Sequence, residues 1–106
     1  MRIDRGSDIT RNVKIIEWMK NEILISVSDL FNVLFKGVKS VDETLQDILA
    51  NIIMITYLLA KRLGISFNEI DYKIKEKTCL GIKENIIIEK WYGDLTNLKN
   101  YIENRK

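Results

Sequence analysis

The sequence has no histidine, no proline and a single cysteine among its 106 residues. Without histidine, the chain alone cannot form a serine triad with an imidazole base, a Cys/His nucleophilic pair or a Cys/His zinc site. The lone Cys79 excludes a disulfide within the chain and is typical of a reducing compartment. The first ten residues also lack the apolar core of a signal peptide, so we expect a cytoplasmic location.

Charge and length limit the partners further. The 17 basic and 15 acidic residues leave a net charge of only +2, which gives no support for a nucleic-acid partner. The most apolar stretch, 48–60, is shorter than the roughly 18 residues of a membrane span, so we expect a core helix and no membrane. A chain of this size is expected to form one domain over 1–106.

The absence of proline favours helix throughout the chain, and the apolar spacing supports this. One set of apolar residues recurs at steps of three or four, as one face of a helix requires: Ile9, Val13, Ile16, Met19, Ile23, Val27, Leu30, Leu34 and Val38. This pattern predicts a first helix over about 9–36, capped by Ser7 or Asp8 and stopped by Gly37. A second helix is expected from Asp42 to about Gly64.

The second half of the chain predicts shorter helices. Ser66 and Glu69 fit a capping box, which predicts a third helix to about Leu80, before Gly81. The β-branched run 86–88 favours an extended segment, after which Asp94 is expected to cap a last helix through about Glu103. The predicted fold is an all-α bundle of about four helices whose first two form a long antiparallel hairpin.

The second helix is unusually apolar. Within 48–60 only Asn51, Thr56 and Tyr57 carry polar side-chain atoms. Such a helix is expected to be surrounded by others on most sides. Because a small monomer covers so much apolar surface with difficulty, a homodimer or tetramer is expected.

Two segments carry a resemblance to a known family. The run Asp47-Ile-Leu-Ala-Asn51, followed by an apolar helix and the Leu-Gly-Ile turn at 63–65, is similar to the second-motif helix of MazG-like all-α nucleoside triphosphate pyrophosphohydrolases. The run Ile25-Ser-Val-Ser-Asp29-Leu30 resembles their Glu-Glu-x-x-Glu-Leu first motif. Trp18 in its helix and the late segment 89–95 look like a short Gram-positive branch of that family. The similar segments run from about Asp8 to Leu98.

The resemblance implies both an activity and a cofactor. Family members hydrolyse nucleoside triphosphates to monophosphate and pyrophosphate, with Mg²⁺ held by carboxylates from two antiparallel helices. Mg²⁺ takes oxygen ligands in octahedral geometry and bridges substrate phosphates, so several carboxylates must converge. Carried over by position, the family's carboxylates fall on Ile25, Ser26, Asp29, Ile48 and Asn51. Only Asp29 remains acidic.

A rearranged metal site is the alternative to a depleted one. Glu22 lies one turn before Ser26, and Asp47 lies one turn before Asn51, so each can share the relevant helix face. The candidate metal ligands are therefore Glu22, Asp29, Asp47 and Asn51. Asn51 has a second interpretation, a hydrogen bond across helices that fixes their register, and the sequence leaves both open.

Some basic and aromatic side chains are candidates for contacts with a nucleotide, and each also has a structural interpretation. Lys73 and Lys77 are candidate phosphate ligands, and Lys61, Arg62 and Lys75 could act with them. The spacing of these residues also fits a solvated helix face on which Glu69 pairs with Lys73, and this interpretation is preferred. Trp18, Trp91 and Tyr92 could stack on a base, although core or interface packing is the stronger expectation. Cys79 is expected to be a partly buried packing residue.

Two functions therefore follow from the sequence. The chain is either a MazG-like protein with a depleted metal site, weakly active or inactive and acting in nucleotide binding or assembly, or an active Mg²⁺-dependent hydrolase with a rearranged site.

Overall fold

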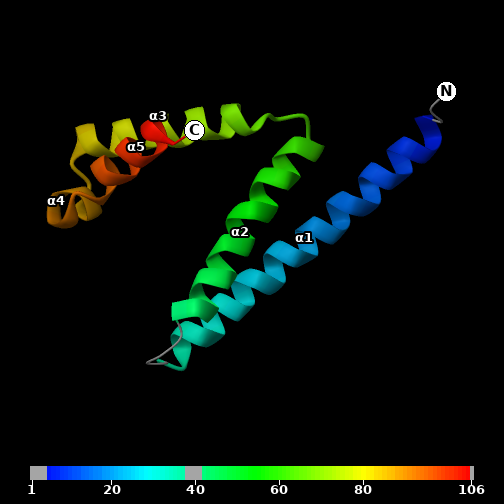
Figure 1. The fold of residues 1–106 in the computed structure, drawn as a ribbon, viewed down its shortest axis with the longest axis horizontal. Coiled ribbons are helices and arrows are strands. Elements are labelled where there is room, and N and C mark those ends of the chain that lie inside the picture. Colours follow the sequence, from blue (N-terminus) through cyan, green and yellow to red (C-terminus); the bar gives the residue numbers. More distant parts are fainter. Residues whose placement is uncertain (1–4, 38–41, 106) are drawn as a thin grey trace. The chain divides into compact units, whose positions relative to one another are not determined.

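The structure is a computed structural model that describes residues 5–37 and 42–105, and all regular elements in these ranges are helices (Figure 1). They are α1 (Arg5–Phe35), α2 (Asp42–Arg62), α3 (Phe67–Glu84), α4 (Ile87–Tyr92) and α5 (Asp94–Asn104). The predicted all-α class is confirmed, with four helices of seven or more residues and one short helix.

The chain divides into two compact units, and each is described here by itself. Unit 1 comprises Met1–Gly64 and contains α1 and α2, while unit 2 comprises Ile65–Lys106 and contains α3, α4 and α5. The expectation of one domain over 1–106 stays a prediction.

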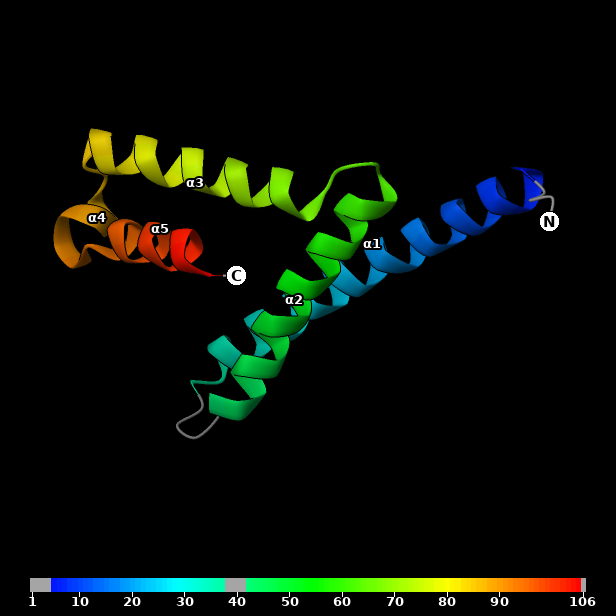
Figure 2. The ribbon, with the colours of Figure 1, turned by 45° about the horizontal axis from the view of Figure 1, so that its top comes forward.

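In unit 1, α1 and α2 pair antiparallel, as predicted (Figure 2). Met19, Ile55 and Ala60 are the buried apolar side chains among the described residues.

Helix α1 begins at Arg5, so the predicted caps at Ser7 and Asp8 are wrong. Asp8 lies in the first turn, where a carboxylate interacts favourably with the helix dipole. Val38, the last residue of the predicted apolar face, lies outside the described residues.

A glycine follows each of the two long helices of unit 1, as the sequence predicts. Gly37 has a φ of 60° and follows α1, while Gly64 has a φ of 87° and follows α2. Only glycine adopts this left-handed backbone without a steric cost, which explains both stops.

Helix α2 is less covered than predicted. Leu49, Ile53 and Met54 are 46–57% exposed, so helices do not surround α2 on most sides. By length and composition, the part of α2 over Glu43–Arg62 is long and apolar enough to cross a membrane, the one such helix in the described ranges. Core helices of soluble proteins pass the same test, so this observation alone does not assign α2 to a membrane.

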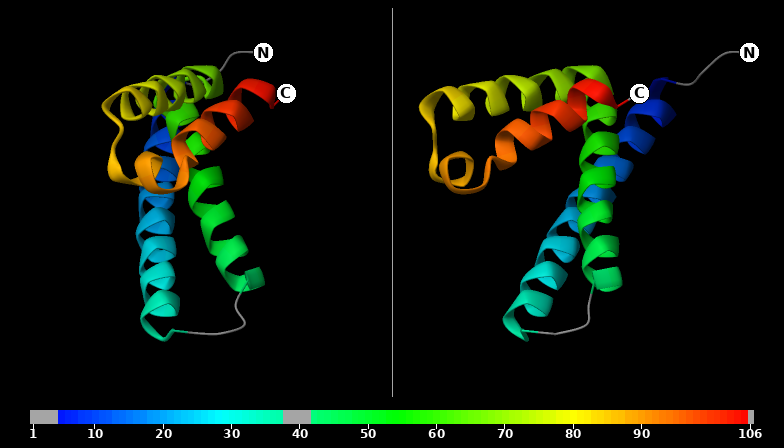
Figure 3. Two further views of the ribbon diagram at one scale, coloured as in Figure 1. Left: turned by 90° about the vertical axis from the view of Figure 1, so that its left-hand side faces the viewer. Right: turned by 60° about the vertical axis from the view of Figure 1, so that its left-hand side comes forward.

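In unit 2, α3 and α5 lie side by side, as two further views also show (Figure 3). The capping box is confirmed: the Glu69 amide donates to Ser66 Oγ at 3.1 Å, and the Ser66 amide donates to Glu69 Oε2 at 2.7 Å. The predicted end at Leu80 is wrong, because α3 continues through Gly81 to Glu84. A methyl group added at Gly81 would lie 2.5 Å from Leu95 Cδ1, so the glycine serves close packing against α5.

The predicted extended segment at 86–88 is also wrong. The amides of Glu89 and Lys90 both donate to the Ile86 carbonyl at 2.9 Å and close a helical turn, which becomes α4. Gly93, with a φ of 67°, separates α4 from α5. Asp94 is thus the first residue of α5 rather than its cap.

Candidate functional site

The positions onto which the resemblance carries the family's metal ligands lie on the α1–α2 pair. Ser26 is buried, with 5% of its surface exposed, and Asn51 of α2 is half-buried opposite it. Asn51 Nδ2 donates to Ser26 Oγ at 2.7 Å. The interpretation of Asn51 as an interhelical hydrogen-bonding residue is therefore the one the structure shows.

This bond satisfies polar groups within an otherwise apolar seam. A buried hydroxyl without a partner costs free energy, whereas a partnered one contributes modestly and fixes the facing positions of two helices. Across the described part of the chain, no buried side-chain nitrogen or oxygen lacks a partner. Ser26 and Asn51 thus form a neutral contact.

Of the remaining motif positions, only Asp29 carries side-chain oxygens. Ile25 is 54% exposed and Ile48 is half-buried, and neither side chain can bind a metal ion. Asp29 is the one acid kept at a motif position, and it is exposed on α1.

The candidate substitute ligands do not form a cluster of acids. Glu22 is half-buried, whereas Asp29 and Asp47 are exposed. Within residues 5–37 and 42–105, no group of three or more His, Cys, Asp or Glu side chains lies close enough to hold a metal ion. MazG-like proteins typically use Mg²⁺, but this donor set does not fit it, since a hard dication needs several converging oxygen ligands. The role of Glu22, Asp29, Asp47 and Asn51 as ligands stays a prediction.

The candidate phosphate ligands lie on α3, in unit 2. Lys73 Nζ lies 3.0 Å from Glu76 Oε1, and its side chain is 71% exposed. The predicted pair of Glu69 with Lys73 is wrong, because Glu69 is used in the capping box. Lys77 is exposed on the same helix. Binding of phosphate by Lys73 and Lys77 stays a prediction.

The aromatic side chains and the cysteine are more exposed than expected. Trp18 is 49% exposed, Trp91 66% and Tyr92 69%, so they are not core residues of one chain. Trp91 and Tyr92 contact each other edge to face, with centroids 6.4 Å apart. Cys79 is also exposed, so its expected role in packing is wrong.

The sequence gave no indication of the hydrogen bonds that the Glu89 carboxylate makes. Glu89 of α4 accepts hydrogen bonds from the Thr96 amide at 3.0 Å and from the Thr96 hydroxyl. These bonds, led by the one from the hydroxyl, lower the pKa of Glu89 from its ordinary value. Glu89 therefore caps α5, whose N-cap residue Gly93 has no side chain for this. Glu89 lies seven residues before Thr96, on the other side of the bend at Gly93, so no local capping motif predicts this contact.

Taken together, the geometry defines an all-α protein with an antiparallel helix pair joined by a neutral hydrogen bond between Asn51 and Ser26. A family model for the MazG-like family matches residues 9–95. The chain therefore belongs to the MazG-like family. Comparison with curated proteins gave no match, and comparison with solved structures gave none either.

Proposed function

We propose that this MazG-like protein is weakly active or inactive as a hydrolase and acts through nucleotide binding or assembly. The observation that carries the proposal is the hydrogen bond between Asn51 Nδ2 and Ser26 Oγ, 2.7 Å long, at two positions where the family's motifs place carboxylates. An amide and a hydroxyl supply no negative charge to offset a dication.

The bond itself opposes metal binding. For Ser26 and Asn51 to coordinate Mg²⁺, their mutual hydrogen bond must break, which costs about 0.5–1.5 kcal/mol. The ion must also lose part of a tightly held hydration shell, and the weak attraction of a neutral pair compensates little of that free-energy cost. Hydrolysis that depends on an activated, metal-bound water is therefore disfavoured at this point of the fold.

Pyrophosphate release tests this proposal. The protein is incubated with ribo- and deoxyribonucleoside triphosphates and either Mg²⁺ or Mn²⁺, with Asp29→Ala as the matched variant. We expect little or no release above the protein-free rate, and the same rate from both forms. Turnover that Asp29→Ala abolishes would overturn the proposal in favour of the active hydrolase with a rearranged carboxylate site.

A second measurement tests the alignment of the motifs. The double variant Ile48→Glu with Asn51→Asp restores two acids on α2 and is expected to bind Mg²⁺ more tightly than the natural chain in calorimetry. An unchanged affinity would show that these positions are not the family's metal positions.

Assembly is the better supported part of the proposal. Helix α1 carries exposed Leu24, Phe31 and Phe35, whose spacings of seven and four residues place them on one face of the helix. On α2, Leu49 and Ile53 are exposed one turn apart. We define these five residues as the outer apolar face of unit 1.

A second copy is the occupant proposed for this face. Phe35 is 92% exposed, and a monomer rarely leaves so many large apolar side chains in water on one helix pair. Pairing two copies through the outer apolar face forms a four-helix arrangement in which both copies bury the same surface. A homodimer, or a tetramer made of two such dimers, is the assembly proposed.

The remaining expectations belong to the same proposal. A cytoplasmic location, the absence of membrane and nucleic-acid partners, and membership of the short Gram-positive branch are proposed on the composition and motifs of the sequence.

A further inference from the structure

One side of the α1–α2 pair in unit 1 carries acidic and exposed apolar side chains together. On α1 these residues recur at steps of four, three and four, which places them on one face of the helix, and the same steps recur on α2. The residues are Trp18, Glu22, Ile25 and Asp29 on α1 and Glu43, Asp47, Ala50 and Met54 on α2. We define these eight residues as the acidic face of unit 1.

The hydrogen bond between Asn51 and Ser26 shows that the two stripes lie on the same side of the helix pair. Ile25 and Ala50 each precede one of the bonded residues by one position, so each is turned by about 100° from the direction of the other helix. Because α1 and α2 are antiparallel, stepping back by one residue turns both stripes to the same side of the pair. The eight residues therefore share one surface.

The acids are spaced along this face rather than gathered at one point. Asp29 lies three residues after Ser26, and Asp47 lies four residues before Asn51, so the two acids are at nearly the same height along the antiparallel pair. Glu22 is about 10 Å from Asp29 along the axis of α1. In the part of the chain that the structure describes, no three acids lie close enough to hold a metal ion. Such a spread suits separate lysine or arginine side chains of an elongated partner better than a single ion.

The carboxylates of this face have no cation beside them among the described residues. Asp29, Asp47 and Glu43 are exposed, and Glu22 is half-buried. Within the same described residues, none of the four lies within 4.0 Å of a lysine or arginine nitrogen, whereas Glu17 of α1 has a lysine partner 2.9 Å away. Their negative charge is therefore available to a partner.

Exposed apolar side chains lie beside the acids. Trp18, Ile25 and Met54 are 49–54% exposed. Tryptophan in particular buries a large area when a partner covers it, and it is enriched where binding energy is concentrated in protein interfaces. Charged groups beside such an apolar surface select the charge of the partner. The acidic face thus offers both an apolar anchor and a preference for positive charge.

The acidic face points away from the outer apolar face. Leu24, Phe31 and Leu49 each follow an acid of the acidic face by two residues, which turns them by about 200° around their helix. A second copy is proposed on the outer apolar face. Placing another copy on the opposite side of the same helix pair would extend the assembly without closing it. A second copy therefore does not suit the acidic face.

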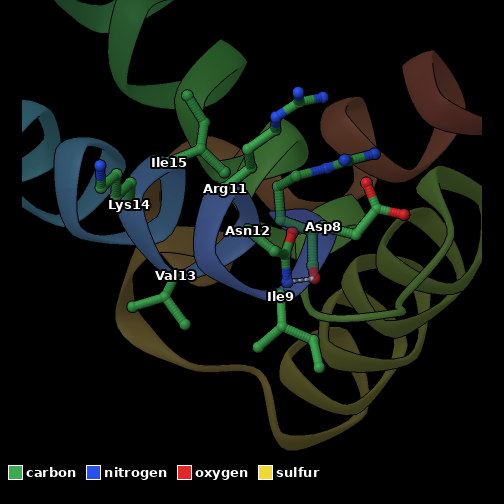
Figure 4. Close-up of a pocket in the computed structure, with 8 residues that line it drawn as sticks. Asp8, Ile9, Arg11, Asn12, Val13, Lys14 and Ile15 are labelled. Atoms are coloured by element: carbon green, nitrogen blue, oxygen red, sulfur yellow. Dashed lines mark hydrogen bonds between the residues drawn. The ribbon is translucent and has the colours of Figure 1, made fainter. Parts of the chain in front are cut away.

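The charge of unit 1 changes sign along the helix pair. Where α1 begins and α2 ends, an open hollow is lined by three cations and an acid, namely Arg11, Lys14, Arg62 and Asp8 (Figure 4). The end where α1 finishes carries Asp29, Asp47 and Glu43, with Lys36 as a cation. A basic partner is therefore attracted to this second end.

We propose that the acidic face binds a basic amphipathic helix of another protein. The helix lays apolar side chains against Trp18, Ile25 and Met54, and directs lysine or arginine side chains to Asp29 and Asp47, a recurring mode of helix recognition. This inference extends the assembly role proposed above and names a second kind of partner. The two fail separately, because the mass of the assembly tests the outer apolar face and peptide binding tests the acidic face.

A synthetic helical peptide tests the face. Its leucines recur at steps of three and four residues and are flanked by lysines, and a scrambled peptide of the same composition lacks the apolar stripe. In the variant Trp91→Phe, Trp18 is the one tryptophan left, so its emission reports contact at the acidic face. We expect the helical peptide to shift this emission to shorter wavelength and to bind on the order of tenfold more tightly than the scrambled one.

Variants of the chain separate the contributions of charge and apolar contact. Asp29→Asn with Asp47→Asn should weaken binding of the helical peptide on the order of tenfold at low salt, and Met54→Gln should weaken it with every charge kept. Arg11→Gln with Lys14→Gln is the matched control, because it removes two charges from the other end of unit 1 and should not weaken binding. All five positions are exposed, and circular dichroism checks that each variant keeps its helices.

Four results would overturn the proposal. The helical peptide does not bind the natural chain at low salt, or the scrambled peptide binds equally well, which would show only a general attraction of polycations. The Asp29 and Asp47 double variant binds the peptide as the natural chain does. That double variant lowers the mass of the assembly in light scattering, which would make a second copy the occupant of the acidic face.

Discussion

In unit 1 two long helices meet through apolar side chains and a neutral bond between Asn51 and Ser26, whereas in unit 2 shorter helices are joined by charged groups. Arg105 Nη2 lies 2.7 Å from Asp71 Oδ1 and its guanidinium lies 5.6 Å from the Tyr101 ring centroid. Lys75 lies 3.8 Å from Glu103. Ion pairs thus join α3 to the end of α5, whereas α1 and α2 are joined by apolar side chains and neutral hydrogen bonds.

Each unit contains one tryptophan, so the comparison can be measured directly. Trp18 lies in α1 and Trp91 in α4, and the sequence has no other tryptophan. Trp91→Phe leaves a fluorescence signal from unit 1, and Trp18→Phe leaves one from unit 2. All unfolding measurements are made at one protein concentration, since association shifts apparent stability.

The largest effect is expected on association through the outer apolar face. The double variant Phe31→Glu with Ile53→Glu places charges on both helices of that face and should convert the dimer or tetramer to a monomer, because a buried unpaired carboxylate is strongly unfavourable. Light scattering after size-exclusion chromatography measures the mass. Tyr72→Glu, at an exposed aromatic position of unit 2, is the control and should keep the assembly. A natural chain that is already monomeric would contradict this prediction.

The next effect concerns the close packing in unit 2. Gly81→Val should lower the free energy of unfolding of unit 2 by about 1–3 kcal/mol, because its side chain meets Leu95. Gly81→Ala should stay within about 1 kcal/mol of the natural chain, since Leu95 Cδ1 is a movable side-chain end and alanine favours helix. Urea unfolding followed at Trp91 measures both. A cost of Gly81→Val that persists unchanged in a Leu95→Ala background would rule out this explanation.

A smaller effect is expected at the neutral contact of unit 1. Ser26→Ala leaves the Asn51 amide without its partner and should cost about 1 kcal/mol of unfolding free energy. A double-mutant cycle with Asn51→Ala, followed at Trp18, should give a coupling of similar size. A coupling near zero would mean that the bond does not stabilise the helix pair.

The smallest effect should depend on pH and be confined to unit 2. Because hydrogen bonds to Thr96 lower the pKa of Glu89 in the folded chain, the stabilisation is full above the unfolded pKa near 4.5 and is lost as pH falls through the lower folded pKa. Glu89→Gln keeps an acceptor without the charge. Its melting temperature should lie below that of the natural chain at pH 7, and the two should converge at acid pH.

Glu84→Gln provides the control for this experiment. It removes an exposed charge from the last turn of α3 and should not reproduce the pH-dependent difference. A difference for Glu89→Gln that persists at the lowest pH would show that the ionised carboxylate is not the source.

Local signals in the sequence predicted the parts of the fold that local physics determines. The apolar spacing predicted α1, Asp42 and Gly64 bounded the predicted α2, and the Ser66–Glu69 capping box predicted the start of α3. The errors arose where distant residues decide the outcome. Gly81 continues a helix because Leu95 packs over it, and Glu89 replaces Asp94 as the cap because the chain bends at Gly93. The exposure of Cys79 is likewise decided by which face of α3 meets α5.

In the candidate site, too, the sequence predicted one part and could not predict another. The resemblance carried two of the family's metal positions onto Ser26 and Asn51, and the structure brings these two residues into contact. The sequence could not show whether Glu22, Asp29 and Asp47 converge, because that depends on how α1 pairs with α2; in the described residues they form no cluster of acids able to hold a metal ion.

The neutral contact between Ser26 and Asn51 also changes what the helix pair needs in order to form. Helices that meet through facing carboxylates repel each other until a cation arrives, so their pairing follows the supply of that cation. Here an amide donates to a hydroxyl, and no repulsion has to be relieved. The α1–α2 hairpin can therefore assemble as soon as it is synthesised, in a chelating solution as readily as in one rich in magnesium.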